Sequence, residues 1–393
     1  MLFISHSAGR TGAPIVLLNA LRWLKANSAL SFEVLVREDG VLRAEFESIA
    51  PTQVLAKAST DSYIGKLAQR LGMQRGPTDE DLLDKLTTAY RGKGIDLVYA
   101  NTITLGRELE ALSQLHCPVV THVHELAHWI EKCGQGNLAR VRKYSHQYVA
   151  ASRAVASYLV GNLGFSPEDI SVVHEFVPVA EIEQRAVDSQ QIRASLRIPN
   201  HAFVVAGSGF ETWRKGKDLF VELAKEVTRR CPDIACFFLW VGGWESSKTE
   251  RNINRQIHHC GLSDRVFFVG EVDNPLDYFA ASDVFAMVSR EDPFPLVCLE
   301  AAALGKPVLC FADAGGMPEF VEDDAGYIVK NLDVVEMADR ILQLAKDPEL
   351  NKNLGKCAHQ KVRARHDVEV GAKAILAVVH KLTAHEQSMT PAR

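Results

Sequence analysis

Short apolar runs alternate along the chain with longer segments of helical periodicity. In the first half the strand-like runs are Leu2–Ser5, Phe32–Val36, Thr52–Leu55, Leu97–Ala100, Val119–His122 and Tyr148–Ala151. Helical patterns fall between them, notably over Tyr63–Leu71, Asp81–Tyr90, Arg107–Leu115 and Val155–Leu163. Strands that alternate with helices in this way predict a doubly wound parallel sheet.

The same alternation begins again beyond a boundary that we place within Ile170–Val179. A polar helix is predicted over Ile182–Leu196. Further strands are predicted at Phe203–Ala206, Cys236–Val241, Val266–Val269, Val284–Val288 and Val308–Phe311. A last strong helix is expected over Val368–His385, after the second sheet is complete. The pattern therefore predicts two similar α/β halves.

The segment Glu291–Gly305 is predicted to be a short loop that leads into a helix. Pro295 suits the first helical position, where a missing N–H costs nothing. The apolar positions repeat at helical spacing and should face a core; they are Leu296, Leu299 and Ala303. The start of such a helix attracts anions, because its first N–H groups are unpaired and its dipole is positive there.

Two carboxylates flank this predicted helix start. Asp292 lies in the loop, and Glu300 lies about one and a half turns into the helix with its side chain leaning back toward the start. A phosphate at the helix start would then have acceptors for hydroxyl groups on either side, as a sugar nucleotide requires. The structural alternative is an Asp N-cap and a surface Glu.

Two other loops after predicted strands have features suited to anions. The loop His6–Pro14 contains Gly9 and Gly12 and leads into a helix, an arrangement that can cradle a phosphate or simply reverse the chain. It lacks both the GxGxxG fingerprint and the GK[ST] ending of NTPase loops. A tight turn is predicted at Gly207-Ser208-Gly209, and Arg214-Lys215 follows it, either as a diphosphate clamp or as a solvated charge run that opposes a helix dipole.

Polar side chains also follow two neighbouring strands of the first predicted sheet. Asn101-Thr102 follows one strand, and the stretch His122–Glu125 includes the end of the next. Ligands bind beyond the carboxyl ends of strands in such sheets. A capped turn with a partly exposed histidine explains the second stretch equally simply, and nothing nearby in the sequence completes a metal-ligand set.

Composition narrows the classes of function. The 393 residues are 47% hydrophobic and 24% charged, which is typical of a globular protein, and the net charge of −5 argues against a general nucleic-acid binder. The eight cysteines form no CxxC pair, so we interpret them as reduced thiols of a cytoplasmic protein. The longest apolar run, Ile234–Val241, is far shorter than the ~20 residues that a membrane helix needs.

Several of these motifs together resemble the retaining family 4 glycosyltransferases, also called glycosyl transferases group 1. The resemblance is clearest over Phe203–Gly326. The matching segments are DPFPLVCLEAAALGKPV with the E-x7-E spacing, WRKGKDLF with the phosphate-binding lysine, AGGMPEFV with the GGxxE loop, VFFVGEVDN with the base-contacting turn, and SDVFAMVSRED as the strand that leads into the acidic motif. The N-terminal half matches more loosely, through the Gly12-Ala13 loop and the position of His124.

The resemblance implies a GT-B fold, in which two Rossmann-like doubly wound parallel-sheet domains face a central cleft. Residues 1–178 are expected to form the acceptor-binding domain and residues 179–365 the nucleotide-sugar-binding domain. Residues 366–393 are expected to form a helix that returns to the first domain, with a frayed tail.

The resemblance also implies roles for individual residues. Glu300 would accept hydrogen bonds from ribose hydroxyls, Asp292 would hold a hydroxyl of the donor sugar, and Lys215 would neutralise the leaving diphosphate. The candidate catalytic residues are His124, Asp292 and Lys215. The candidate donor-binding residues are Gly12, Ala13, Gly209, Arg214, Lys215, Val272, Asp292, Phe294, Leu296, Val297 and Glu300.

The chain departs from the family pattern at three positions. Asp292 replaces the usual first Glu, although Glu291 is adjacent. The usual phosphate-binding Arg is missing near Ser208, and Arg214 is its candidate substitute. Pro295 stands where the family usually has Gly and supplies no backbone N–H to the donor.

The implied reaction is transfer of a sugar from a nucleotide-diphosphate-sugar to a hydroxyl, with retention of anomeric configuration. No metal and no cofactor are expected, because the only DxD triplet, Asp79-Glu80-Asp81, opens a helix in the first half. The expected acceptor is a saccharide or lipid-linked saccharide, which would bring the protein to the cytoplasmic membrane face; no nucleic-acid partner is expected. A sugar-nucleotide epimerase and a non-catalytic scaffold remain alternatives.

Overall fold

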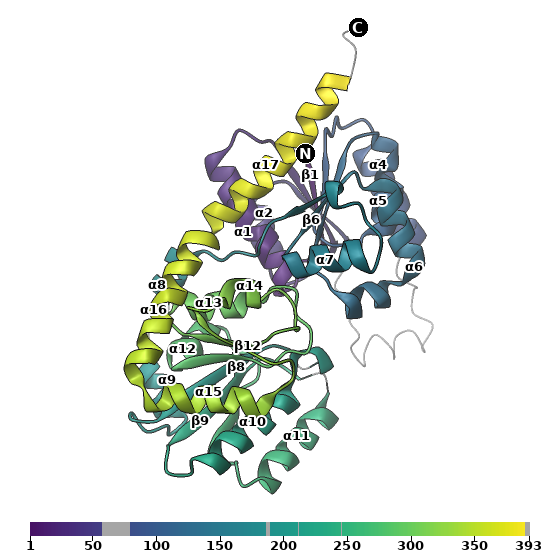
Figure 1. Ribbon diagram of the computed structural model, residues 1–393. Coiled ribbons are helices and arrows are strands. Elements are labelled where there is room, and N and C mark those ends of the chain that lie inside the picture. Colours follow the sequence, from purple (N-terminus) through teal and green to yellow (C-terminus); the bar gives the residue numbers. More distant parts are fainter. Residues whose placement is uncertain (57–78, 186–188, 211, 245, 390–393) are drawn as a thin grey trace, which may run out of the picture. The chain divides into compact units, whose positions relative to one another are not determined.

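The computed structural model describes residues 1–56, 79–185, 189–210, 212–244 and 246–389, and it divides into two compact units (Figure 1). The N-terminal unit comprises Met1–His174 with Gly371–Arg393, and the C-terminal unit comprises Glu175–Val370. The expected helix Tyr63–Leu71 lies outside the described residues. The two sheets confirm the prediction of two Rossmann-like α/β units.

The N-terminal unit is built on a seven-stranded sheet in the order β3-β2-β1-β4-β5-β6-β7, with every pair of neighbours parallel. Its strands are β1 (Leu2–Ser7), β2 (Glu33–Glu38), β3 (Thr52–Ala56), β4 (Val98–Ala100), β5 (Val119–Val123), β6 (Gln147–Ala150) and β7 (Ile170–Val172). Residue Ile4 of β1 pairs with Leu35 on one side and Ala100 on the other. The strand order therefore reverses between β1 and β4.

The described helices of this unit connect the strands. They are α1 (Gly12–Asn27), α2 (Arg43–Ile49), α4 (Asp79–Tyr90), α5 (Gly106–Leu112), α6 (Ala127–Tyr144), α7 (Arg153–Gly161) and most of α17 (Val368–Met389), with short 3-10 turns η1 (Ser113–Leu115) and η2 (Pro167–Asp169). The sequence did not predict α6, because its first half is polar and Gly134 interrupts it with a φ of 79°. From Gly371 on, α17 belongs to the N-terminal unit.

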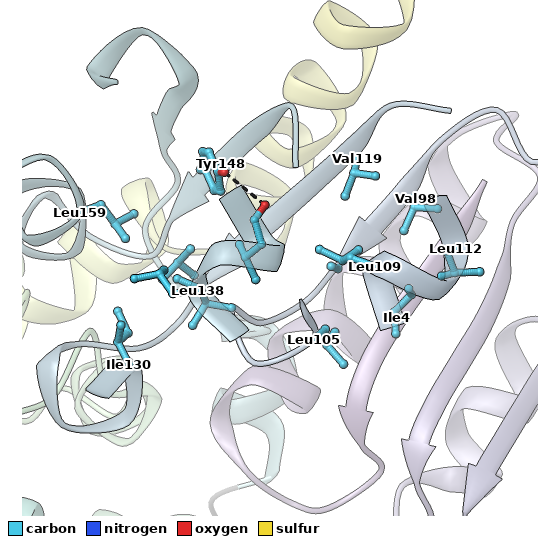
Figure 2. Packing of buried hydrophobic residues seen from close by; sticks show 14 of the residues in the cluster. Ile4, Val98, Leu105, Leu109, Leu112, Val119, Ile130, Leu138, Tyr148 and Leu159 are labelled. Carbon is cyan, nitrogen blue, oxygen red and sulfur yellow. Dashed lines mark hydrogen bonds between the residues drawn. The ribbon is translucent and has the colours of Figure 1, made fainter. Parts of the chain in front are cut away.

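The core of the N-terminal unit forms where helices cover the apolar strands. Figure 2 shows Ile4 and Val98 from the sheet near Leu109 and Leu112 of α5. All four side chains are at most 3% exposed. Continuous apolar strands are typical of parallel sheets, which are buried on both faces. This core holds the carboxyl ends of β1, β4 and β5 in place.

The C-terminal unit repeats the plan with a six-stranded parallel sheet in the order β10-β9-β8-β11-β12-β13. Its strands are β8 (Phe203–Ser208), β9 (Cys236–Val241), β10 (Val266–Phe268), β11 (Val284–Met287), β12 (Val308–Phe311) and β13 (Gly326–Val329). Figure 1 shows α12 and α13 on one side of this sheet and α10 and α11 on the other. Here the strand order reverses between β8 and β11.

The helices of the C-terminal unit complete the fold. They are α8 (Val179–Arg185), α9 (Ser189–Ser195), α10 (Lys217–Arg230), α11 (Ser247–His259), α12 (Pro275–Ala280), α13 (Leu296–Ala303), α14 (Pro318–Val321), α15 (Val334–Lys346) and α16 (Pro348–Arg365), with the 3-10 turn η3 (Trp213–Lys215).

Several sequence predictions for this unit were wrong in detail. Strand β8 continues through Ser208, so the turn begins only at Gly209. Within the span expected as a polar helix, Ile182–Leu196, the described residues form α8 and α9, and residues 186–188 between them lie outside the described part of the chain. Pro295 is the N-cap of α13 with extended backbone and not its first helical residue. The sequence also failed to predict β13, α15 and α16. Among the described residues, no helix is long and apolar enough to cross a membrane.

Candidate active site

The switch point of the C-terminal sheet, between β8 and β11, brings together residues that lie about 75 positions apart in the chain. The backbone N–H of Arg290 donates to the carbonyl oxygen of Arg214 at 2.7 Å. The Arg214 guanidinium donates in turn to the carbonyl oxygen of Glu291 at 2.6 Å. The turn η3 and the loop after β11 are therefore joined side by side beyond the carboxyl ends of their strands.

Lys215 and Asp292 meet at this junction. The Lys215 ammonium lies 2.6 Å from a carboxylate oxygen of Asp292, and the side chains are only 19% and 8% exposed. The hydroxyl of Ser289 donates to the same oxygen at 3.2 Å. The backbone N–H of Asp292 donates to the carbonyl oxygen of Ala314 at 2.6 Å. Asp292 is thus held by several contacts and does not cap α13, which excludes the N-cap alternative.

Two glycines allow this close arrangement. Gly209 has a φ of 150°, and a Cβ atom there would lie 2.9 Å from Cδ of Lys215. Gly216 has a φ of 70°, and a Cβ atom there would lie 2.2 Å from the carbonyl oxygen of Val288. A side chain at either position would be strained and would displace its neighbour. Gly209 therefore leaves room for the Lys215 side chain, and Gly216 lets η3 approach the end of β11.

Arg290 fixes the outer side of η3. Its guanidinium forms a bidentate pair with Asp218 at 2.8 and 2.6 Å and donates to the carbonyl oxygen of Trp213 at 2.9 Å. It also lies over the Trp213 ring, 5.4 Å from its centroid. The pairing raises the pKa of Arg290 and, together with hydrogen bonds from the start of α10, lowers the pKa of Asp218 against the opposing effect of its burial. Arg290 therefore holds η3 in its observed conformation.

Glu300 is the fifth of the eight residues of α13. Its side chain is partly exposed, yet burial raises the pKa of its carboxyl group to about 7. None of the described residues donates a hydrogen bond to this carboxyl group. The first turn of α13 contains no acidic residue, and Pro295 offers its N–H groups no side-chain cap. The helix therefore has an uncapped start and an acceptor without a donor.

The remaining candidates of the C-terminal unit contribute differently. The ring of Phe294 is buried and stacks on His366 with centroids 5.2 Å apart, so any contact with a donor would come from its backbone. Leu296 is 8% exposed and Val297 is partly exposed at the start of α13. Val272 is half-buried in the loop after β10.

The other candidates lie in the N-terminal unit, at the switch point between β1 and β4. The side chain of Asn101, directly after β4, lies between two of them. Its Nδ2 donates to the carbonyl oxygen of Ala13 at 2.8 Å, and its Oδ1 lies 3.1 Å from Nε2 of His124. Gly12 begins α1, and Thr11 before it provides no side-chain cap.

Two buried polar residues, Glu125 and His122, contact His124. Glu125 is 8% exposed and accepts from the backbone N–H of His124 at 2.9 Å and from the hydroxyl of Thr102. The ring of His122 lies against that of His124 with centroids 3.8 Å apart and the two planes tilted by 39°, and Nδ1 of His122 lies 2.9 Å from the hydroxyl of Tyr99. Burial lowers the pKa of His122 well below its usual value and raises that of Glu125.

Sequence reasoning did not find several of these residues. Ser289 and Arg290 immediately precede the acidic motif, but only the fold shows that they hold Asp292 and η3. Lys217 is 2% exposed and donates to the carbonyl oxygens of Gly242 and Gly243 at 3.1 and 2.7 Å. No sequence pattern distinguishes this buried lysine from Arg214 and Lys215, which are partly exposed. Spacing alone does not predict such contacts.

Two family models match the chain, one largely in each unit. The model described as "Glycosyl transferases group 1" matches residues 188–361, and the model described as "Glycosyltransferase Family 4" matches residues 32–181.

Curated proteins of similar sequence include two enzymes of sugar chemistry. The N-acetyl-alpha-D-glucosaminyl L-malate synthase of Bacillus anthracis is 30% identical over 197 residues, which are 50% of this chain and 49% of that enzyme. The D-inositol 3-phosphate glycosyltransferase 1 of Catenulispora acidiphila is 25% identical over 317 residues, 79% of this chain and 74% of the relative. The chain thus spans about half the length of the first relative and about three quarters of the second.

Solved structures share the fold over nearly the whole chain. HepE of Anabaena in complex with UDP-glucose matches with a TM-score of 0.80 at 22% identity, over 97% of this chain and 99% of that one. Two Rossmann-like units, together with this structural similarity, define a protein with the GT-B fold. With both family models matched, the chain belongs to the glycosyl transferases group 1, that is, to glycosyltransferase family 4.

Proposed function

We propose that this protein transfers a sugar from a nucleotide-diphosphate-sugar to an acceptor hydroxyl, with retention of anomeric configuration and without a metal ion. The observation that carries the proposal is the Lys215–Asp292 pair at the β8/β11 switch point. It places a cation and a hydroxyl acceptor 2.6 Å apart. In a nucleotide-sugar the distal phosphate and the sugar hydroxyls are neighbours, so one such pair suits both groups.

The diphosphate requires positive charge. Lys215 supplies a point charge, Arg214 supplies a fork of donors of which one is already used by Glu291, and the uncapped N–H groups at the start of α13 supply fixed dipoles. When the anomeric C–O bond breaks, negative charge grows on the leaving phosphate. Donors that are already in place stabilise that charge without reorganisation.

The nucleoside is proposed to bind through Glu300. Its carboxyl group accepts no hydrogen bond from the described residues, and burial raises its pKa. Two ribose hydroxyls would supply the missing donors. Charged acceptors form the stronger hydrogen bonds, so ribose binding should favour the ionised form. Val272, in the loop after β10, is the proposed contact for the base.

The N-terminal unit is proposed to supply the acceptor site, with His124 as its catalytic candidate and Gly12-Ala13 as additional diphosphate ligands. We propose no protein nucleophile; the leaving phosphate would deprotonate the acceptor hydroxyl. The HepE structure in complex with UDP-glucose supports a UDP-sugar as the first donor to test. The proposed acceptor is a saccharide or lipid-linked saccharide in cytoplasmic polysaccharide or glycoconjugate synthesis.

The proposal is tested by proton NMR of the purified full-length protein with UDP-glucose, GDP-glucose and ADP-glucose in EDTA. We expect one donor to be consumed, with release of the nucleoside diphosphate and an α-configured product or, without acceptor, slow hydrolysis. A new sugar-nucleotide epimer without diphosphate release would indicate the epimerase. Consumption that requires added Mn²⁺ would contradict the metal-free clamp, and no consumption with any donor and no nucleotide binding would indicate a scaffold.

A further inference from the structure

We infer that Asn101 is a positioning residue that fixes the tautomer of His124 and links it to the first turn of α1. Asn101 is 1% exposed and lies directly after β4. Its side-chain amide has one partner at each end, Ala13 at 2.8 Å and His124 at 3.1 Å. The predicted kinetic effects of this inference rest on the proposed function. The predicted tautomer of His124 does not.

The orientation of the Asn101 amide follows from its backbone partner. The carbonyl oxygen of Ala13 can only accept a hydrogen bond, so the NH₂ group of Asn101 must face it. The oxygen of the amide then necessarily faces Nε2 of His124. The reversed amide would place two oxygens 2.8 Å apart and leave the partly buried carbonyl oxygen of Ala13 without this donor.

The tautomer of His124 follows from that orientation. An amide oxygen accepts, so Nε2 of His124 must carry a proton. In the neutral ring Nδ1 then carries the lone pair. The Asn101 amide therefore fixes which ring nitrogen of neutral His124 carries the proton.

The same amide also holds the backbone that follows β1. Ala13 belongs to the first turn of α1, whose first residue, Gly12, has no side-chain cap before it. A displacement of this turn would therefore shift the Asn101 side chain and, through its second hydrogen bond, the ring of His124. The proposed phosphate-binding turn and the proposed catalytic residue are thus connected by hydrogen bonds to one side chain.

The first experiment measures the tautomer in the full-length wild-type protein. Long-range proton–nitrogen NMR of ¹⁵N-histidine-labelled protein distinguishes the two neutral tautomers, and a His124→Gln sample identifies His124 among the 14 histidines. At a pH where the ring is neutral we expect Nε2 protonated and Nδ1 bare. Protonation at Nδ1 would overturn the inference, whatever the activity.

Two substitutions of Asn101 distinguish its contact with Ala13 from its contact with His124. Asn101→Asp keeps an acceptor for Nε2–H but removes the donor to Ala13, so the tautomer should persist while the first turn of α1 is released. Asn101→Ala removes both contacts, so the fraction of neutral His124 with the proton on Nε2 should fall. Asn137 provides the matched control, because it also bridges two backbone groups, Ile103 at 2.8 Å and Gly106 at 3.0 Å, without contacting His124. Asn137→Ala should leave the tautomer of His124 unchanged.

Kinetics with the donor that is turned over provide the second readout. Asn101→Ala should lower kcat by 10-fold to 100-fold, on the order expected for a misplaced reacting group. Asn101→Asp should mainly raise KM for the donor. Equal effects of Asn101→Ala and Asn137→Ala on kcat would contradict a positioning role. If the wild type consumes no nucleotide-sugar, the proposed function fails, and the tautomer measurement alone decides this inference.

Discussion

Glu300 makes the strongest residue-scale prediction, because the fold changes the ionisation of its carboxyl group. Burial raises its pKa from 4.5 to about 7. Between these pH values the folded state retains a proton that the unfolded chain has lost, so this group lowers the free energy of unfolding as the pH rises from 4.5 to about 7. Above that range the loss is complete.

Glu300→Gln cannot ionise and should therefore become more stable relative to the wild type as the pH rises through this window. Urea unfolding at pH 5, near the lower end of this range, and at pH 8, above it, measures the difference in the free energy of unfolding between the two proteins. The variant should at the same time lose most of its affinity for the donor nucleotide. Parallel stability profiles of the two proteins would show that Glu300 has an ordinary pKa.

Lys215 and Asp292 permit a second test at the residue scale. Lys215→Gln would leave the buried carboxylate of Asp292 without its cation, so we expect a loss of ~2–4 kcal/mol in the free energy of unfolding and almost complete loss of transfer. Adding Asp292→Asn should restore part of the stability but no activity. Chemical denaturation and the donor-consumption assay measure these effects.

Lys225→Gln is the matched control. Lys225 pairs with Glu222 at 3.1 Å, but both side chains are at least 40% exposed. Its loss should change the free energy of unfolding only slightly and leave transfer unchanged. A loss of stability in Lys215→Gln no larger than in this control would show that the Lys215–Asp292 pair is as solvated as a surface ion pair.

At the scale of elements, the approach of η3 to the end of β11 depends on Gly216. Gly216→Ala combines a left-handed backbone with a Cβ atom 2.2 Å from the carbonyl oxygen of Val288. Gly261→Ala has a similar φ of 66° but open space around the Cβ position. The control should lose ~1 kcal/mol for backbone strain alone, and Gly216→Ala should lose clearly more, together with nucleotide binding.

Thermal unfolding and nucleotide titration of both glycine variants check this prediction. Equal losses of stability would mean that only backbone strain matters at Gly216. A stable Gly216→Ala protein with normal nucleotide affinity would show that η3 need not lie against β11 for the site to work.

The elements also show how much the sequence could predict. Apolar runs located most strands and both sheets, and the E-x7-E spacing located α13. The sequence missed α6, because Gly134 and polar residues obscure its periodicity. It placed Pro295 one position too far into α13, since proline suits both the N-cap and the first turn. The strand through Ser208 was cut short, because glycine normally indicates a turn.

The contacts within the site were less predictable than the elements that carry them. The pairing joins Lys215 of η3, which follows β8, to Asp292 in the loop that follows β11, and no sequence pattern predicts the distance between them. The link from Ala13 through Asn101 to His124 joins three segments of the N-terminal unit. Such contacts depend on sheet order, which places β8 beside β11 and β1 beside β4, and periodicity does not reveal this order.

At the scale of the whole molecule, the two units have separate sheets, and most of the candidate donor-binding residues lie in the C-terminal unit. We expect UDP to slow hydrogen exchange chiefly in the C-terminal unit, at η3, at the loop from Ser289 to Pro295 and at the start of α13. A ligand that binds the folded state opposes local opening where it binds. Protection confined to the N-terminal unit would contradict the assignment of the donor site.

The most direct test of the account is isothermal titration of the full-length protein with UDP and with UMP in EDTA. If Lys215, Arg214 and the start of α13 hold a diphosphate, UDP should bind at least ~10-fold more tightly than UMP without any metal, a difference of about 1.4 kcal/mol. Lys215→Gln should abolish most of that difference. Equal affinities for UDP and UMP, or binding of UDP only after Mn²⁺ is added, would contradict the diphosphate clamp.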